Sequence, residues 1–124
     1  MIGIGIDVVP VSRIQEMLEK HGERMLQRFF TAAELEGAQD LAYQAYHLAG
    51  RVAAKEATYK ALSAQGADLG ISWQHMEVRK LEDGRPELVL YGAALQRFHA
   101  LGARRAHLSL SHDGGIAAAV VVLE

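Results

Sequence analysis

The sequence predicts an α+β domain built on a mainly antiparallel sheet and one long, closely packed helix. Three observations carry this prediction: an apolar strand pattern opens the chain, helical periodicity extends to about residue 65, and strand patterns then form two hairpins. The expected order is strand, three helices, hairpin, helix and hairpin. The chain has 124 residues and no internal repeat or linker-like stretch, so it fits one domain spanning residues 1–124.

A buried strand and a helix are predicted first. Ile2–Val9 alternates isoleucine with glycine and then becomes apolar, and Pro10 ends the strand. Ser12 and Gln15 fit a capping box, in which each side chain satisfies an orphan amide at the start of a helix. This helix is expected to run to about Phe29.

Two more helices are expected before the first hairpin. Thr31 and Glu34 form a second capping box, so a short helix should begin near Thr31. Apolar residues at helical spacing then predict a long helix from about Tyr43 to Gln65. One stripe of this helix carries only small residues, so that stripe should pack closely against the sheet. The stripe comprises Gly50, Ala54, Ala57 and Ala61.

A hairpin and a short helix follow. Strands over Trp73–Leu81 and Pro86–Tyr91 should pair through a turn at Asp83-Gly84, a dipeptide typical of tight hairpins. A short helix is then predicted over Ala93–Leu101.

A second hairpin closes the chain. Arg105–Ser111 alternates as a strand, and a glycine turn leads into a last strand over Ile116–Leu123. This last strand is apolar on both faces, so it is either central in a covered sheet or buried against another subunit. Because a chain this short has few helices to cover two faces, we expect an oligomer.

Composition excludes several classes of protein. A net charge of −2 is too small to indicate bulk binding of nucleic acid or of a membrane surface. The longest apolar run, Ile116–Leu123, is too short to span a bilayer, and the N-terminus lacks a signal-peptide pattern. The absence of cysteine excludes disulfides and thiolate metal sites. We therefore expect a cytoplasmic protein.

The long helix carries the candidate catalytic residues. Glu56 and Lys60 lie one turn apart on one face, and close packing would bring Glu56 near Asp7 of the first strand. Two carboxylates on rigid elements suit Mg²⁺ together with substrate phosphates, and Lys60 would neutralise a phosphate oxygen. Lys55 lies on the apolar stripe, where a charge needs a partner. Alternatively, Glu56 and Lys60 form a surface ion pair worth about 0.3–0.5 kcal/mol, and Asp7 ends its strand or caps a turn.

Two short motifs indicate no activity of their own. Gly3 and Gly5 lie inside a strand and lack the third glycine of a dinucleotide fingerprint, so we expect them to admit another backbone closely. Ser111 and His112 are adjacent in a strand and point to opposite faces, which argues against a serine hydrolase.

The first helix separates its charges by sign. Arg13, Lys20 and Arg24 fall along one side with Met17 among them, and glutamates fall along another. A basic side with an embedded methionine suits an acidic helical partner, although a charged face is more often only solvated.

Taken together, these segments resemble the holo-acyl-carrier-protein synthase family of 4′-phosphopantetheinyl transferases, nearly from end to end. The Lys-Glu-Ala-x-x-Lys core after an early Gly-Ile-Asp is highly specific. After that core, the family's Gly-Thr-Gly-like loop is replaced by Ala61-Leu62-Ser63-Ala64-Gln65-Gly66. The matching segments are Gly3-Ile-Gly-Ile-Asp7-Val-Val, Arg28-Phe-Phe-Thr-x-x-Glu34-Leu, Arg51-Val-Ala-Ala-Lys55-Glu56-Ala-x-x-Lys60-Ala, Gly84-Arg-Pro86 and Leu108-Ser-Leu-Ser-His112-Asp.

The resemblance implies a set of site residues and a substrate. It implies Mg²⁺ bound by Asp7 and Glu56 together with the pyrophosphate of coenzyme A. It also implies that Lys60, Arg51 and His112 help to hold the nucleotide and its phosphates.

The resemblance also implies partners. It implies a homotrimer with active sites at subunit interfaces, and a basic first helix that docks an acyl carrier protein. Arg13 is the residue most expected to contact the carrier, with Met17, Lys20 and Arg24 beside it.

The implied reaction transfers 4′-phosphopantetheine from coenzyme A to a serine of the carrier protein, in support of fatty acid biosynthesis, and releases 3′,5′-ADP. The proton acceptor is either Glu56 or a water held by the metal. Two other readings stay open: a nucleotide-binding trimer without transfer activity, and a metal-dependent pyrophosphate hydrolase.

Overall fold

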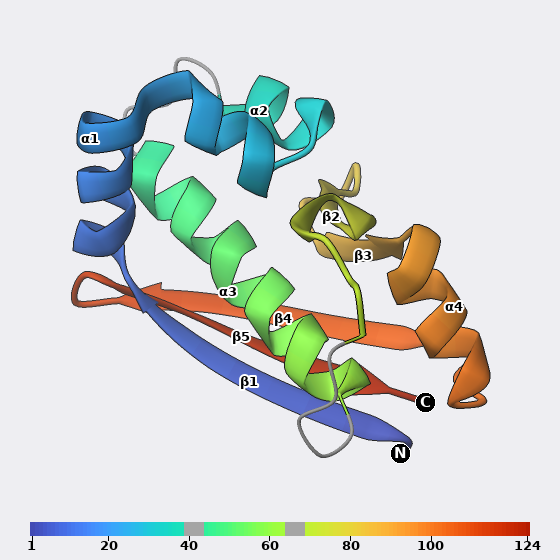
Figure 1. Cartoon of the computed structure of the whole chain (residues 1–124). Helices are drawn as coiled ribbons and strands as arrows, with labels where there is room; N and C mark the ends of the chain where they lie inside the picture. Colours follow the sequence, from blue (N-terminus) through green and yellow to red (C-terminus); the bar gives the residue numbers. More distant parts are fainter. Residues whose placement is uncertain (39–43, 64–68) are drawn as a thin grey trace.

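The computed structural model describes residues 1–38, 44–63 and 69–124. Figure 1 shows a sheet with one long helix lying across it, and smaller elements gathered on the same side of the sheet. Along the chain the elements are β1 (Gly3–Pro10), α1 (Val11–Phe29), α2 (Ala32–Ala38), α3 (Gln44–Leu62), a 3₁₀ turn (Trp73–His75), β2 (Met76–Lys80), β3 (Pro86–Leu90), α4 (Gly92–Ala100), β4 (Ala106–Asp113) and β5 (Ile116–Leu123).

All strand pairs among the described residues are antiparallel, as the sequence predicts. The larger sheet has the order β1-β5-β4, and β2 pairs with β3 in a separate hairpin. Within the larger sheet Asp7 of β1 lies opposite Ala119 of β5, which in turn lies opposite Leu110 of β4. Because paired residues share a face, Asp7 is on the same side as the alanines that α3 covers.

The small-residue stripe of α3 packs against the sheet, which confirms the expected close approach. A β-carbon added to Gly3 would collide with the backbone of Ala61, and one added to Gly5 would collide with the backbone of Ala57. Glycine in β1 therefore allows two backbones to touch. This contact fixes where the charged residues of α3 lie relative to β1.

The opposite face of the larger sheet carries apolar side chains that nothing in the described chain covers. Ile4, Ile6 and Val8 of β1 are 58%, 60% and 54% exposed. On β5 the outward side chains include Val120, which is half-buried, and Ile116, which is 43% exposed. The last strand is thus central in its sheet, yet one of its two apolar faces is open.

The first helix differs from the prediction in two ways. Ser12 does not cap it: α1 begins at Val11, directly after Pro10, whose φ of −64° and ψ of 132° join strand to helix without a capping side chain. The helix is also interrupted at Gly22, which has φ 59° and ψ −150°. Only glycine adopts this backbone conformation readily, so the helix changes direction there.

The second capping box is confirmed. The Thr31 amide donates to Glu34 Oε1 at 2.9 Å, and the Glu34 amide donates to Thr31 Oγ1 at 3.2 Å. Glu34 is nevertheless buried, because its carboxylate also faces the core. Glu34 therefore both completes the capping box and carries a buried carboxylate.

Other boundaries shift by a few residues. The strand predicted from Trp73 begins at Met76, since Trp73–His75 forms a 3₁₀ turn closed by a capping box between Ser72 and His75. The predicted ends of the long helix, Tyr43 and Gln65, lie outside the described residues, as does much of the segment that replaces the family's glycine loop. Among the residues described, no helix is long and apolar enough to cross a membrane.

Candidate active site

Packing of α3 on β1 brings three predicted residues together. Lys60 Nζ lies 3.0 Å from Asp7 Oδ1 and also donates to the Ile6 carbonyl at 3.0 Å. Glu56 is held from the other side by Arg13, whose Nη2 is 3.1 Å from Glu56 Oε1. Glu56 and Lys60 therefore pair with α1 and β1 rather than with each other, which makes the simple surface-pair interpretation wrong.

The two carboxylates of the site influence one another. Burial alone would raise the pKa of Asp7, but hydrogen bonding to Glu56 and Lys60 lowers it below 3.8. Burial raises the pKa of Glu56 above 4.5, and the neighbouring Asp7 carboxylate raises it further, against the opposing effect of Arg13. Two acids this close cannot both ionise freely, so the pair favours either a shared proton or a cation.

The donor set fits Mg²⁺. Asp7 Oδ2 is buried and has no hydrogen-bond partner, which leaves an acceptor available for a cation. Across the described parts of the chain, no cluster of three or more potential ligands occurs. Two carboxylates such as Asp7 and Glu56 suit an ion that takes one or two protein carboxylates and completes its shell with water and substrate phosphates.

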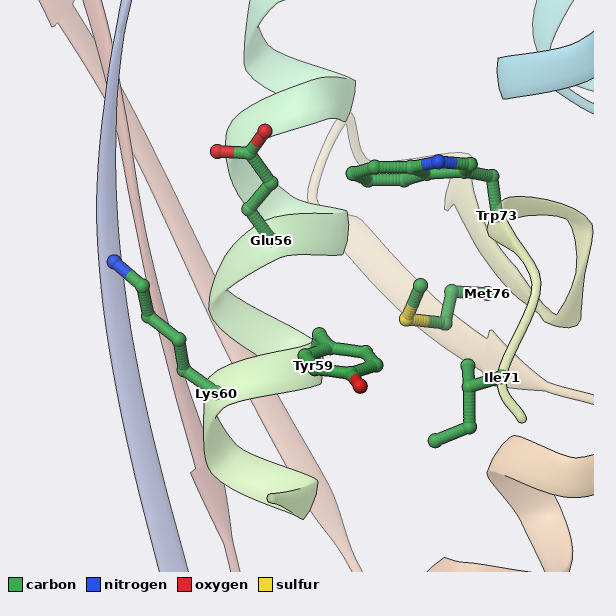
Figure 2. Close-up of a pocket in the computed structure, with 6 residues that line it drawn as sticks. All are labelled: Glu56, Tyr59, Lys60, Ile71, Trp73 and Met76. Carbon is green, nitrogen blue, oxygen red and sulfur yellow. The ribbon is translucent and has the colours of Figure 1, made fainter. Parts of the chain in front are cut away.

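A pocket of about 380 Å³ opens beside these charges. Glu56, Tyr59 and Lys60 of α3 line one side of it, and Figure 2 shows Tyr59 pointing toward the opposite wall while Glu56 and Lys60 point toward β1. The opposite wall comes from the 3₁₀ turn, the residues just before it and the start of β2. That wall consists of Ile71, Trp73 and Met76.

Sequence reasoning missed the apolar lining of this pocket. Tyr59 stands three residues after Glu56, so its position could have been inferred from helical spacing. Trp73 and Met76 could not, because only the fold brings the 3₁₀ turn opposite α3.

Arg51 and His112 lie elsewhere in the same chain. Arg51 is five residues before Glu56, about 140° around the helix, and it faces a second cavity of about 440 Å³. His112 is an exposed residue near the end of β4, where its ring packs edge-on against Tyr46 at 5.7 Å. A single chain therefore does not bring these two residues into the pocket beside Glu56.

The cavity at Arg51 is basic. His47, Arg79 and Lys80 line it together with Arg51 and the buried Glu34. Burial lowers the pKa of Arg51, which Glu34 opposes, and the Arg51 Nε is buried without a partner. Burial, assisted by Arg51 and Lys80, lowers the pKa of His47 to about 4. The unpartnered donor suits an anion.

The basic side of α1 is divided by the break at Gly22. Arg13 lies at the active-site end of the helix, against Glu56, and Lys20 is exposed just before the break. Arg24 follows the break and lines a shallow groove of about 610 Å³ with Arg28. Met17 is half-buried and packs against the core. Of the predicted carrier-binding residues, Arg13 thus lies at the active site, whereas Arg24 belongs to a second basic patch beyond Gly22.

Comparisons with known proteins identify the family. Residues 3–121 match the 4′-phosphopantetheinyl transferase superfamily. The chain is 45% identical to a holo-acyl-carrier-protein synthase of Geotalea daltonii over 122 residues, covering 98% of this chain and 97% of the relative.

Solved structures of such synthases share the fold. The Neisseria meningitidis enzyme matches with a TM-score of 0.89 and 31% identity, over 100% of this chain and 98% of that one. The Helicobacter pylori enzyme, solved in complex with coenzyme A, matches with a TM-score of 0.83 and 30% identity, over 98% of this chain and 99% of that one. The chain therefore belongs to the 4′-phosphopantetheinyl transferase superfamily and is a phosphopantetheinyl transferase.

Proposed function

We propose that this enzyme transfers 4′-phosphopantetheine from coenzyme A to a serine of an acyl carrier protein, with Mg²⁺ as its metal. One observation carries the proposal: Glu56 and Lys60 line a pocket whose other walls are largely apolar, and Lys60 pairs with Asp7 beside it. Such a pocket matches a substrate with a pyrophosphate at one end of a slender, weakly polar arm.

Coenzyme A has this form, and the Helicobacter pylori relative was solved in complex with it. The pantetheine arm would run along Tyr59, Trp73 and Met76, and the pyrophosphate would lie near Lys60. The acceptor follows from the relatives, which are named holo-acyl-carrier-protein synthases.

Asp7 and Glu56 would hold the Mg²⁺ ion. When bound, the ion neutralises negative charge on the pyrophosphate, the main requirement of phosphoryl-type transfer. The unpartnered Asp7 Oδ2 and the mutual effect of the two carboxylates on their pKa values support this assignment. Asp7, with its lowered pKa, stays ionised at neutral pH.

The chain's own residues supply positioning and proton transfer. Glu56, with its raised pKa, suits a base that takes the proton of the carrier serine hydroxyl. The serine oxygen then forms a bond to the β-phosphorus of coenzyme A as the pyrophosphate bond breaks, and 3′,5′-ADP leaves. Lys60, which pairs with Asp7 in this structure, would leave that partner and stabilise charge on the phosphate oxygens once substrate binds.

The carrier protein would dock along α1. Arg13 stands at the site itself, so a carrier bound there would present its serine close to Glu56. Lys20 and Arg24 are exposed further along the helix and would attract an acidic partner.

We also propose a homotrimer. The open apolar face of β1 and β5 is typical of an interface between subunits. Arg51 and His112 lie away from the pocket of their own chain, so they would reach the nucleotide of a site completed by a neighbouring subunit.

The proposal is tested by measuring 3′,5′-ADP release by chromatography. The enzyme, Mg²⁺ and coenzyme A are incubated with apo carrier protein or with a carrier whose acceptor serine is alanine. Release that needs the serine supports transfer. Release with the alanine carrier would indicate a pyrophosphate hydrolase, and coenzyme A binding without release would indicate a binding protein.

A further inference from the structure

A buried ion pair joins α2 to α3 on the side of the long helix away from the sheet. Lys55 Nζ lies 2.7 Å from Glu34 Oε1, and both side chains have no exposed surface. Burial lowers the pKa of Lys55, and Glu34 opposes that effect. Removing two charges from water costs more than most such pairs return, so stability alone gives little reason for this one.

Every donor of the Lys55 ammonium has an acceptor. Besides Glu34, Nζ donates to the Phe29 carbonyl at 2.7 Å and to the Trp73 carbonyl at 3.1 Å. An ammonium has three N–H donors, so these three acceptors satisfy it fully. Nζ also lies 5.4 Å from the centre of the Phe30 ring, within cation–π range.

The acid is held just as firmly. Glu34 Oε1 accepts from the Thr31 amide, and Oε2 accepts from the Val78 amide at 2.9 Å. The pair therefore connects α3 with the end of α1, the start of α2, the 3₁₀ turn and β2. Side chains on rigid elements act as one unit when they are bonded in this way.

Trp73 is the part of this unit that faces the substrate pocket. Figure 2 shows its indole standing opposite α3, with Met76 below it. Its ring also packs on Phe29 at 4.8 Å, so the two residues whose carbonyls Lys55 binds also contact each other. The backbone of Trp73 has no regular strand partner at this point, because it lies in the 3₁₀ turn.

We propose that Lys55, paired with Glu34, is a positioning residue: it fixes Trp73 as a wall of the pocket and so sets the enzyme's affinity for the pantetheine arm. This role rests on the proposed function for the identity of the arm. Of the hydrogen-bond and ion-pair partners of Lys55 in the described residues, only Trp73 lines the pocket, so Lys55 acts through that residue. Its neighbour in sequence, Glu56, faces Asp7 and Arg13 instead.

The test uses the double variant Glu34→Gln with Lys55→Met. Lys55→Met alone would leave the Glu34 carboxylate buried without a counter-charge. The double variant removes both charges, and the glutamine side chain keeps one carbonyl oxygen that can accept from the backbone amide at the start of α2. Trp73 is the only tryptophan of the chain, so its fluorescence reports directly on the wall. We expect a red-shifted emission and stronger quenching by acrylamide.

The second readout is binding by calorimetry. Coenzyme A and 3′,5′-ADP share the nucleotide and differ by 4′-phosphopantetheine, that is, by the pantetheine arm and its phosphate. Trp73 lines the path proposed for the arm, so only coenzyme A should respond. We expect the Kd for coenzyme A to rise roughly tenfold or more, as small misplacements in a site commonly cost, and the Kd for 3′,5′-ADP to change less than twofold.

The control is Thr58→Val on the same helix, whose buried hydroxyl donates to the Ala54 carbonyl at 2.6 Å. It should lower stability while leaving the emission and the preference for coenzyme A unchanged. Unchanged emission in the double variant, or equal effects from Thr58→Val, would overturn the positioning role whatever the enzyme transfers. A red shift in the double variant, found while the wild-type enzyme fails the ADP-release assay, would support the positioning of Trp73 by Lys55 and contradict the proposed function alone.

Discussion

Lys55 and Glu56 are neighbours in sequence, yet their charges face different chemistry. Lys55 is fully buried and bonded to carbonyls, whereas Glu56 points toward Asp7 and Arg13. Sequence alone marks Lys55 as a charge that needs a partner, because it interrupts an apolar stripe. It does not identify the partners, since two of them are backbone carbonyls that the fold alone brings near.

Removing the charge of Glu56 tests the metal assignment. Glu56→Gln should lower kcat for transfer roughly a hundredfold or more, because charge stabilisation by the metal and proton acceptance are both weakened. The melting temperature of the metal-free protein should not fall, because the substitution removes the repulsion between the Asp7 and Glu56 carboxylates that raises the Glu56 pKa. Turnover is measured by product mass and stability by circular dichroism.

The matched control for that variant is Glu19→Gln, an exposed acid of α1. It should leave both turnover and melting temperature unchanged. Near-normal turnover of a folded Glu56→Gln enzyme would contradict the metal assignment.

His47 gives a prediction on pH. Its pKa is about 4 in the folded protein against an ordinary 6.5, so the unfolded chain binds more protons between these values. The free energy of unfolding should therefore fall as pH drops from about 6.5 to 4, by less than about 1.4 kcal/mol per pH unit from this residue. Urea unfolding across this range measures the slope.

His47→Gln should flatten that slope. An equal slope in the wild type and in His47→Gln would show that the histidine does not titrate between folded and unfolded states as described.

At the scale of single elements, sequence patterns located each helix and strand, and the differences have local causes. The Asp83-Gly84 hairpin and the Thr31 cap depend on neighbouring residues only, so they were predictable. The start of β2 was not, because Trp73 has strand propensity but is drawn into a 3₁₀ turn held by Lys55. The break at Gly22 has a visible signal, a glycine within the helical pattern.

The division of α1 refines the docking prediction. Reversing Arg13 would place a new acid beside Glu56, so it would disturb the site as well as docking. Arg24→Glu, beyond the break, should raise KM for the carrier protein severalfold and leave coenzyme A binding unchanged, because exposed charges mainly set encounter rate. Steady-state kinetics at several salt concentrations measure this effect.

The wild-type rate at low carrier concentration should fall as salt rises, and Arg24→Glu should show a flatter response. Glu23→Gln, the exposed acid next to it, should change little. A salt-insensitive wild type would show that this side of α1 is only solvated.

For the molecule as a whole, the predicted antiparallel architecture is confirmed, but the predicted site residues do not all meet within one chain. The early Gly-Ile-Asp and the Lys-Glu-Ala-x-x-Lys core meet because glycines let α3 touch β1, which sequence anticipated. Arg51 and His112 do not join them in one chain, and no pattern within a single sequence states where a second chain would bind. The open apolar face of the sheet is the feature that points to one.

Assembly is tested on that face. Ile6 is 60% exposed in the single chain, so Ile6→Lys should not unfold it, but a trimer buried over this sheet would meet an unpaired charge. We expect the wild type to sediment as a trimer at micromolar concentration and Ile6→Lys as a folded monomer with little activity. Leu95→Lys, an exposed apolar residue of α4, is the control and should remain trimeric.

A wild-type protein that sediments as an active monomer would contradict the shared site. Loss of fold in Ile6→Lys would contradict the description of this face as open in the single chain.

The proposed transfer is tested most directly by the intact mass of an apo acyl carrier protein after incubation with this enzyme, coenzyme A and Mg²⁺. We expect the carrier to gain one phosphopantetheine, a chelator to prevent the gain, and Asp7→Asn or Glu56→Gln nearly to abolish it. An unchanged carrier mass with the folded wild-type enzyme, or a gain that persists in both variants, would contradict the proposed transfer.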